Sequence, residues 1–246
     1  LFNLFLRSHM NNTKIGFFAY AASPREIGET IEKAIEEANS KTQNSKIKSW
    51  TSLDIAGHFI SQQVLNGIDD ANFLLADITV LNFNVTYEIG YAIGRGKRLL
   101  LTRNTSLKEQ YPTINEVGIF DTLGYKNYQN SRELSEFVNE AQTKEPLELP
   151  TKKNISAPVY LLEGRYKTDW ASRIVSRIKK AKYIFRSFDP NEQPRLSAND
   201  AIKQVSESYG VVIPLISSTA EGSEVHNMRG AFLAGLADGM NIALCI

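Results

Sequence analysis

The stretch NVTYEIGYAIGRGKRLLL, from Asn84 to Leu101, decides the fold. Its first part carries Ile, Ala and Gly at helical spacing, and the aliphatic run after Gly96 predicts a buried strand. A helix that passes through glycine directly into an aliphatic strand is typical of the repeating unit of an α/β sheet. Glu88 is the exception, because it is a carboxylate expected in the first turn of an otherwise apolar helix.

The same alternation of strands and helices begins at Lys14. Strands are predicted at KIGFFAY, KIKSW, NFLLADIT and KRLLLT, with a short edge strand in VGIFDTLGY. Helices are predicted in SPREIGETIEKAIEEANS, in SLDIAGHFISQQVLNGIDDA with Ser52 as N-cap, and in SRELSEFVNEAQT with Ser131 as cap. The repeat predicts an α/β fold of Rossmann-like or flavodoxin-like three-layer units, with parallel sheets and helices on both faces.

A second, similar series follows the proline-containing segment EPLELPTKKNISAP. PVYLLEG predicts an opening strand, and NMRGAFLAGLADGMNIALCI parallels the helix-to-strand segment that begins at Asn84. We interpret the chain as a tandem duplication with a degenerate second copy that lacks the last strand and helix of the first. The expected division is 1–9 as an expression-tag remnant, 10–144 as the first domain, 145–157 as a linker and 158–246 as the second, truncated unit.

Matching the two copies suggests what the second has lost. If Gly239 is matched to Gly96, Ala231 falls at the place of Glu88, and Pro214 falls near the place of Asp77. The second copy is therefore expected to lack the carboxylate and to serve as scaffold, dimer surface or ligand sensor. The chain stops at Ile246 within a strand-like run, which is the basis for expecting a further C-terminal domain.

The composition excludes several classes of function. The chain has 246 residues, 42% hydrophobic and 22% charged, and its net charge of +1 implies no attraction to nucleic acid or an anionic membrane. The single cysteine, Cys245, excludes an internal disulfide and favours a cytoplasmic location. The three histidines show no ligand spacing, so no metal site is predicted. The apolar start LFNLFLRSHM is too short to span a bilayer.

One motif makes the first unit specific. An aliphatic strand ends in Ala-Asp, and a short loop leads to Asn-Phe-Asn-Val and then to Tyr-Glu-Ile-Gly-Tyr-Ala. This pattern resembles the nucleoside 2-deoxyribosyltransferase superfamily, which includes nucleotide N-glycoside hydrolases and is distantly similar to TIR-type domains. The resemblance covers roughly residues 14–143. It implies that Glu88 is the nucleophile that attacks the anomeric carbon of the sugar and expels the base.

The chemistry agrees with that position. Cleavage of an N-glycosidic bond builds positive charge at the anomeric carbon, which an ionised carboxylate stabilises or traps. A helix N-terminus favours the anion, and ligands of open α/β sheets bind beyond the carboxyl ends of the strands. The alternative is that Glu88 only stabilises its helix. Asp77 ends a strand and is a second catalytic candidate that would orient the sugar or the nucleophile; alternatively it forms a turn.

Other candidates for substrate binding surround these two. Tyr20, Ser23 and Arg25 lie where the first strand enters a helix and are candidates for holding a phosphate. Asp54 and His58 are expected one turn apart on the second helix, near the sugar or base. Four further residues have two possible roles each. Asn82 and Asn84 either cap the helix or contact the ligand. Tyr87 and Tyr91 either pack in the core or stack on a base. Family transferases commonly carry aspartate at the place of Asn82, and this departure favours hydrolysis over transfer.

The leading hypothesis is a cytoplasmic enzyme that cleaves or exchanges the N-glycosidic bond of a nucleoside, a nucleotide or NAD, with hydrolysis favoured over transfer and without a metal or organic cofactor. One alternative is a non-catalytic nucleotide-sensing module that regulates another domain. A further alternative is a TIR-like NAD hydrolase of stress or antiviral defence, activated by assembly. The resemblance also implies a homo-oligomer, because family members often complete the site from a neighbouring subunit. No membrane or nucleic-acid partner is expected.

Overall fold

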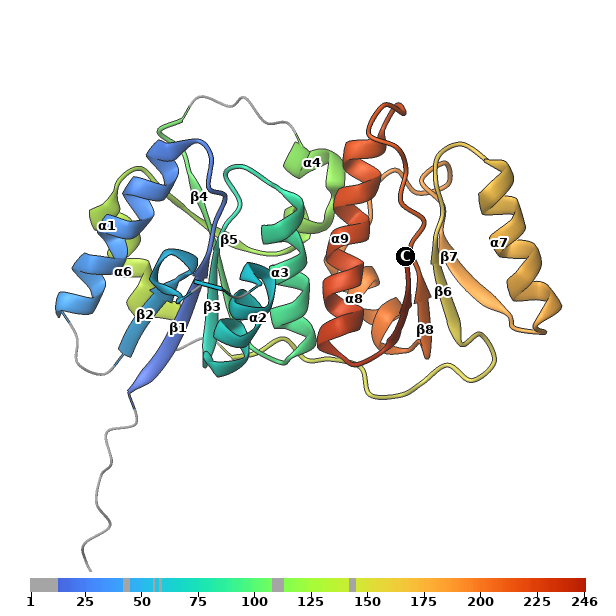
Figure 1. Cartoon of the computed structure of the whole chain (residues 1–246), viewed down its shortest axis with the longest axis horizontal. Helices are drawn as coiled ribbons and strands as arrows, with labels where there is room; N and C mark the ends of the chain where they lie inside the picture. Colours follow the sequence, from blue (N-terminus) through green and yellow to red (C-terminus); the bar gives the residue numbers. More distant parts are fainter. Residues whose placement is uncertain (1–12, 42–44, 55, 58, 108–112, 142–144) are drawn as a thin grey trace, which may run out of the picture.

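Two parallel β-sheets carry helices on their faces in the computed structural model of the chain (Figure 1). The structure describes residues 13–41, 45–54, 56–57, 59–107, 113–141 and 145–246. The predicted α/β class, with two Rossmann-like units, is confirmed. Within these ranges no helix is long and apolar enough to cross a bilayer.

The first sheet has the strand order β2-β1-β3-β4-β5, and every neighbouring pair is parallel. On β1, Phe17 faces α2 and α3, whereas the next residue, Phe18, faces α1 and α6, as the alternation of side chains along a strand requires. The sheet is therefore the middle of three layers. Its elements are β1 (Lys14–Ala19), α1 (Arg25–Lys41), β2 (Ser45–Ser49), α2 (Ile60–Asp70), β3 (Phe73–Asp77), α3 (Phe83–Gly94), β4 (Arg98–Asn104), β5 (Tyr125–Tyr128) and α6 (Ser131–Ala141).

Two of the predicted boundaries are wrong. Ser52 does not begin α2: its hydroxyl donates to the Ser49 carbonyl at 2.7 Å and closes a 3-10 turn over Trp50–Ser52. The segment VGIFDT is helical and contributes to α4 (Thr113–Val117) and α5 (Ile119–Thr122), which are separated by Gly118 at a φ of 84°. The edge strand begins only at Tyr125, where the predicted strand ended.

The second sheet repeats the order of the first four strands. It runs β7-β6-β8-β9, again with parallel pairs. Ser197 is the N-cap of α8, because its hydroxyl accepts from the Asp200 amide at 3.1 Å. The elements are β6 (Val159–Leu162), α7 (Asp169–Lys180), β7 (Phe185–Phe188), α8 (Ala198–Ser206), β8 (Gly210–Val212), α9 (Ser223–Gly239) and β9 (Ala243–Cys245).

The ends of α3 and α9 give the register between the two units. The Lys97 amide donates to the Ala92 carbonyl, and the Ile242 amide donates to the Ala237 carbonyl, both at 2.9 Å or less. Gly96 and Asn241 both adopt positive φ, at 66° and 54°. Asn241 therefore corresponds to Gly96, because Asn is among the residues that tolerate this conformation.

This register corrects the sequence match by two residues. Gly239 corresponds to Gly94 rather than to Gly96, so Leu233, and not Ala231, stands at the place of Glu88. Leu233 is fully buried. The second unit thus carries no carboxylate at this place, which supports the interpretation of a degenerate copy.

The two units pack through α3 and α9, which lie side by side between the sheets (Figure 1). Glycines allow the close approach. A Cβ on Gly90 would overlap the Phe232 carbonyl oxygen, and a Cβ on Gly235 would overlap that of Tyr87. One apolar core extends across this contact and includes Ile89 from the first unit.

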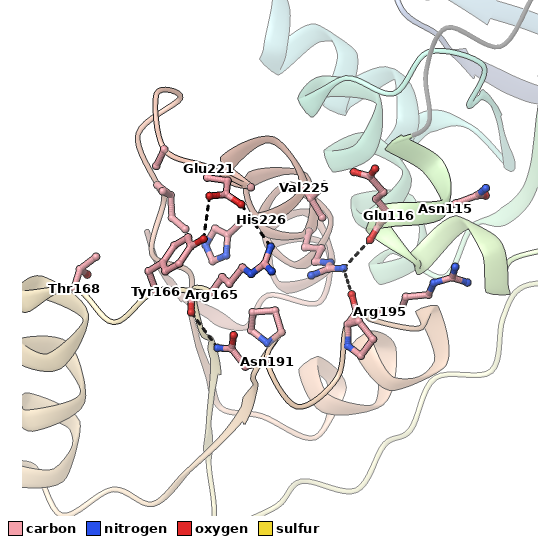
Figure 2. Close-up of a pocket in the computed structure, with 16 residues that line it drawn as sticks. Asn115, Glu116, Arg165, Tyr166, Thr168, Asn191, Arg195, Glu221, Val225 and His226 are labelled. Carbon is pink, nitrogen blue, oxygen red and sulfur yellow. Dashed lines mark hydrogen bonds and ion pairs between the residues drawn. The ribbon is translucent and has the colours of Figure 1, made fainter.

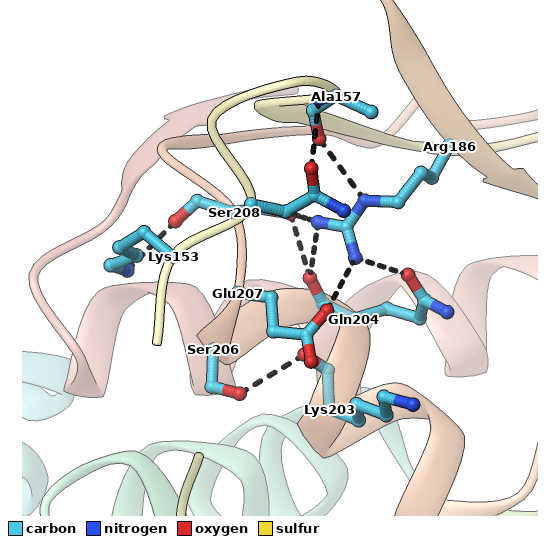
Figure 3. A network of polar contacts seen from close by, with 9 residues as sticks. Lys153, Ala157, Arg186, Lys203, Gln204, Ser206, Glu207 and Ser208 are labelled. Carbon is cyan, nitrogen blue, oxygen red and sulfur yellow. Dashed lines mark hydrogen bonds and ion pairs between the residues drawn. The ribbon is translucent and has the colours of Figure 1, made fainter. Parts of the chain in front are cut away.

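The predicted linker, 145–157, contains no helix or strand and ends against the second unit. Figure 3 shows the polar network that holds it. Lys153 donates to the Ser208 carbonyl at 2.8 Å, and Arg186 donates to the Ala157 carbonyl at 3.1 Å. Arg186 also pairs with Glu207 at 3.2 Å. The last residues of the linker are therefore fixed to the end of α8.

Candidate functional site

Asn82 sets the start of α3 and with it the position of Glu88. The Asn82 side-chain oxygen accepts from the Val85 amide at 2.8 Å, so Asn82 is the N-cap and the helix begins at Phe83. Glu88 is the sixth residue of α3 and lies in its second turn, not in the first as predicted. The effect of the helix dipole fades within the first turn, so the cap contributes little to ionising Glu88.

The Glu88 carboxyl is half-buried and forms no hydrogen bond or ion pair with any described residue. Its burial raises the pKa to about 8, because removal from water penalises the charged form. Burial therefore favours the protonated form of this carboxyl in the ligand-free protein. An unpaired carboxyl with a strongly raised pKa, on the helix that follows a central strand, is a feature of functional sites.

The aromatic residues beside Glu88 belong to helix packing. The Tyr91 hydroxyl donates to Asp69 of α2 at 2.9 Å, and the Tyr87 hydroxyl donates to Asp238 of α9. The two rings stack on each other with centroids 6.4 Å apart. Burial also raises the pKa of Tyr91 to about 12. Of the two roles that the sequence left open, the structure therefore places both tyrosines in packing.

Asp77 ends β3 with its side chain turned into the core, where it is only 1% exposed. It accepts from the Thr79 amide at 3.0 Å and from the Tyr128 hydroxyl at 2.8 Å. Burial raises the pKa of Asp77 to about 6, although these hydrogen bonds act in the opposite direction. In this arrangement Asp77 forms the turn after β3 and ties it to β5.

Replacing Asp77 tests that structural role. Asp77→Ala would leave the Tyr128 hydroxyl and the Thr79 amide without their acceptor, and we expect the free energy of unfolding to fall by about 2–4 kcal/mol. Asp77→Asn keeps one acceptor oxygen for the Thr79 amide, and the Tyr128 hydroxyl can turn to accept from the new NH2 group, so this change should cost about 1 kcal/mol or less. Urea unfolding at pH 7 measures both. Equal losses for the two variants would contradict the role of the acceptor.

The residues predicted to hold a phosphate do not converge. The Tyr20 hydroxyl donates to Glu32 of α1, which also accepts from the hydroxyls of Ser49 and Thr51 at 2.7 Å each. Ser23 is exposed, and the exposed Arg25 pairs with Glu29 at 2.6 Å. Glu32 was not predicted, because its three hydroxyl partners are 12 to 19 residues away in the sequence.

The remaining candidates lie on the surface around α2 and α3. Asp54 is exposed and precedes α2, so it is not on the second helix as predicted. His58 lies outside the described residues. Asn84 is exposed in the first turn of α3, four residues before Glu88 and therefore on the same face of the helix. Of the predicted site residues, Asn84 is the one that shares an accessible face with Glu88.

A cavity of about 630 Å³ lies at the second unit, away from the predicted residues. Figure 2 shows Arg165, Tyr166 and Glu221 on one side of it and Glu116 and Arg195 on the other. Sequence reasoning missed this site. The only available signal was the expectation that ligands bind beyond the carboxyl ends of parallel strands, which applies to both sheets.

No family model matches the chain, and no characterised protein matches it in sequence at a significant level. Among the described residues, no three of His, Cys, Asp or Glu lie together in a way that would hold a metal ion.

Proposed function

We propose that the chain cleaves the N-glycosidic bond of a nucleoside, a nucleotide or NAD, with Glu88 as the nucleophile and water as the favoured acceptor. One observation carries the proposal: the half-buried carboxyl of Glu88 has no partner among the described residues and is desolvated. The resemblance of the motif around Glu88 to deoxyribosyltransferase-like enzymes supports the choice of reaction.

The proposed reaction has two steps. The Glu88 carboxylate bonds to the anomeric carbon while the carbon–nitrogen bond breaks, and the electron pair leaves with the base, which takes up a proton from solvent. Water then attacks the same carbon, releases the carboxylate and gives the free sugar. The positive charge that develops on the sugar favours the ionised carboxylate, which offsets the desolvation of Glu88 when substrate is bound.

The test is chromatographic detection of released base from a panel of nucleosides, nucleotides and NAD, between pH 6 and pH 9. We expect kcat/KM to rise with pH and to level off above about pH 8, because the free protein must lose the Glu88 proton. The Glu88→Ala protein is the control and should release no base. A rate that falls as pH rises would make Glu88 a proton donor instead of a nucleophile.

A second candidate function is a nucleotide-sensing module without catalysis. The cavity of the second unit favours it, because that unit offers a ligand site but no carboxylate at the place of Glu88. This reading predicts nucleotide binding with no released base from any member of the panel after prolonged incubation.

A further inference from the structure

The cavity of the second unit has the position and size of a small-molecule site. It is lined by the loops that follow β6, β7 and β8 and by the N-terminal half of α9, and α4 of the first unit closes one side. Its volume of about 630 Å³ falls within the ordinary range for ligand pockets. The carboxyl ends of parallel strands are where such sheets bind ligands.

Arg229 places a buried positive charge beside this cavity. Its side chain is 4% exposed, and its Nε donates to the Val117 carbonyl at 3.0 Å. Nη2 donates to the carbonyls of Glu116 and Pro194, both at 2.7 Å. All these acceptors are neutral, and no described carboxylate pairs with the guanidinium. A buried guanidinium stays protonated. The Phe188 ring lies under it, with its centroid 5.1 Å from Cζ, but no described anion neutralises the charge.

One nitrogen of Arg229 is left over for a ligand. Nη1 forms no hydrogen bond with any described residue. Among the described residues, every side-chain nitrogen or oxygen that is shielded from water has a hydrogen-bond partner. Nη1 is therefore accessible, and the space beside it is the cavity that Arg229 lines. Guanidinium N–H groups of this kind match the oxygens of phosphate.

The surroundings of Arg229 also favour an anion. The N-cap of α9, Gly222, has no side chain to satisfy the free amides of the first turn, and it lines the cavity. Arg165 and Arg195 also lie at the wall, but each has an acidic partner: Arg165 lies 3.9 Å from Glu221, and Arg195 pairs with Asp121 at 3.3 Å. His226 holds the Pro214 carbonyl at 2.6 Å, and burial lowers its pKa, so it adds no charge at neutral pH.

Tyr166 supplies a surface for an aromatic ring. Its side chain is half exposed at the cavity wall, and its hydroxyl is held by Glu221 at 3.1 Å (Figure 2). Glu221 also lies 3.9 Å from Arg165, so the three side chains form one polar group at the mouth. An aromatic base stacks on such a ring while a phosphate reaches the arginines.

We propose that the second unit binds a nucleoside monophosphate in this cavity, with the phosphate at Arg229 and the base against Tyr166. The site is separate from Glu88 and does not depend on the proposed reaction. It assigns a binding role to the unit that has no carboxylate corresponding to Glu88.

The test is calorimetric titration of the full chain with each of the four common nucleoside 5′-monophosphates, and with adenosine and inorganic phosphate. We expect at least one nucleotide to bind, with adenosine weaker by about tenfold or more. Arg165→Ala and Tyr166→Ala should each lower the affinity for that nucleotide about tenfold or more. Both side chains are exposed, so they can be removed without unfolding the chain. Arg173→Ala, on the exposed face of α7, is the matched control and should leave affinity unchanged.

Three results would overturn the proposal. The first is no binding of any of the four nucleotides. The second is nucleotide binding that the two cavity variants leave unchanged, which would locate the ligand elsewhere, for example at Glu88. The third is inorganic phosphate binding as tightly as the nucleotides, which would indicate an anion site without a place for a base. None of these readouts depends on base release, so the site can fail while the proposed reaction holds, and the reverse.

Discussion

Glu88→Gln is expected to abolish base release while making the folded protein more stable. The nucleophile cannot be replaced by an amide, so we expect the rate to fall by about 10³-fold or more. The gain in stability has a separate cause. In the unfolded chain Glu88 ionises near its ordinary pKa of 4.5, whereas burial in the folded protein raises the pKa to about 8.

The sign of the effect on stability follows from these two values. Because the folded pKa is the higher one, the folded state holds the Glu88 proton more tightly than the unfolded state. The free energy of unfolding therefore falls as pH rises from about 4.5 to about 8. Below and above this range, Glu88 no longer makes the free energy of unfolding depend on pH. Glutamine never ionises, so the variant does not suffer this loss. We expect a gain on the order of 3 kcal/mol at pH 8.5 and little at pH 5.

Urea unfolding at pH 5 and pH 8.5, together with the base-release assay, measures both effects. Glu36→Gln, at an exposed position of α1, is the matched control and should change neither quantity. A stability difference that is the same at both pH values would show that Glu88 is not desolvated. Base release at the wild-type rate would remove Glu88 from the reaction. The combination that we expect is the trade of stability for activity found at functional sites.

The sequence predicted the fold because the fold depends on local periodicity. Aliphatic runs such as LLLT and helical spacings such as that of Ile27, Ile31 and Ile35 can be seen within one short window. The boundaries were less accurate where a side chain closes a local turn. Ser52 is an acceptable N-cap by residue type, but its hydroxyl bonds back to Ser49 and leaves α2 to begin at Ile60.

The candidate site was predicted less well because its geometry depends on contacts between distant segments. Asp77 has the residue type and place of a catalytic carboxylate, yet Tyr128, 51 residues away, holds it in the core. The Tyr87 hydroxyl is likewise held by a distant residue, Asp238, which is 151 residues away in the sequence. The residues of the cavity in the second unit could not be predicted, since Arg229 is positioned by carbonyls of two distant segments, the end of α4 and the loop after β7.

The contact between α3 and α9 leads to the second prediction of a large effect, which concerns Gly235→Ala. Helix propensity alone predicts a gain of about 1 kcal/mol, because alanine is the better helix former. The structure predicts the opposite sign. The new methyl group would overlap the Tyr87 carbonyl oxygen and would lie 2.8 Å from the Tyr91 amide, both backbone atoms that cannot rotate away. The helices must separate, and the core that they share must open.

We expect Gly235→Ala to lower the free energy of unfolding by about 3 kcal/mol or more, which corresponds to a Tm lower by roughly 10 °C for a chain of this size. Gly124→Ala is the matched control, because Gly124 has no neighbour within 4 Å of the added Cβ. Differential scanning calorimetry measures both. An unchanged or higher Tm for Gly235→Ala would mean that the two helices do not approach as closely as described.

The double variant Gly90→Ala with Gly235→Ala separates a shared contact from two independent ones. Each glycine meets the backbone of the other helix, Gly90 at Phe232 and Gly235 at Tyr87, so the two positions lie at one crossing. Once the first methyl group has moved the helices apart, the second meets a wider gap and should cost less than it does alone. We therefore expect a combined loss smaller than the sum of the two single losses. Simple additivity would indicate two local adjustments and would argue against a single rigid contact that joins the two units.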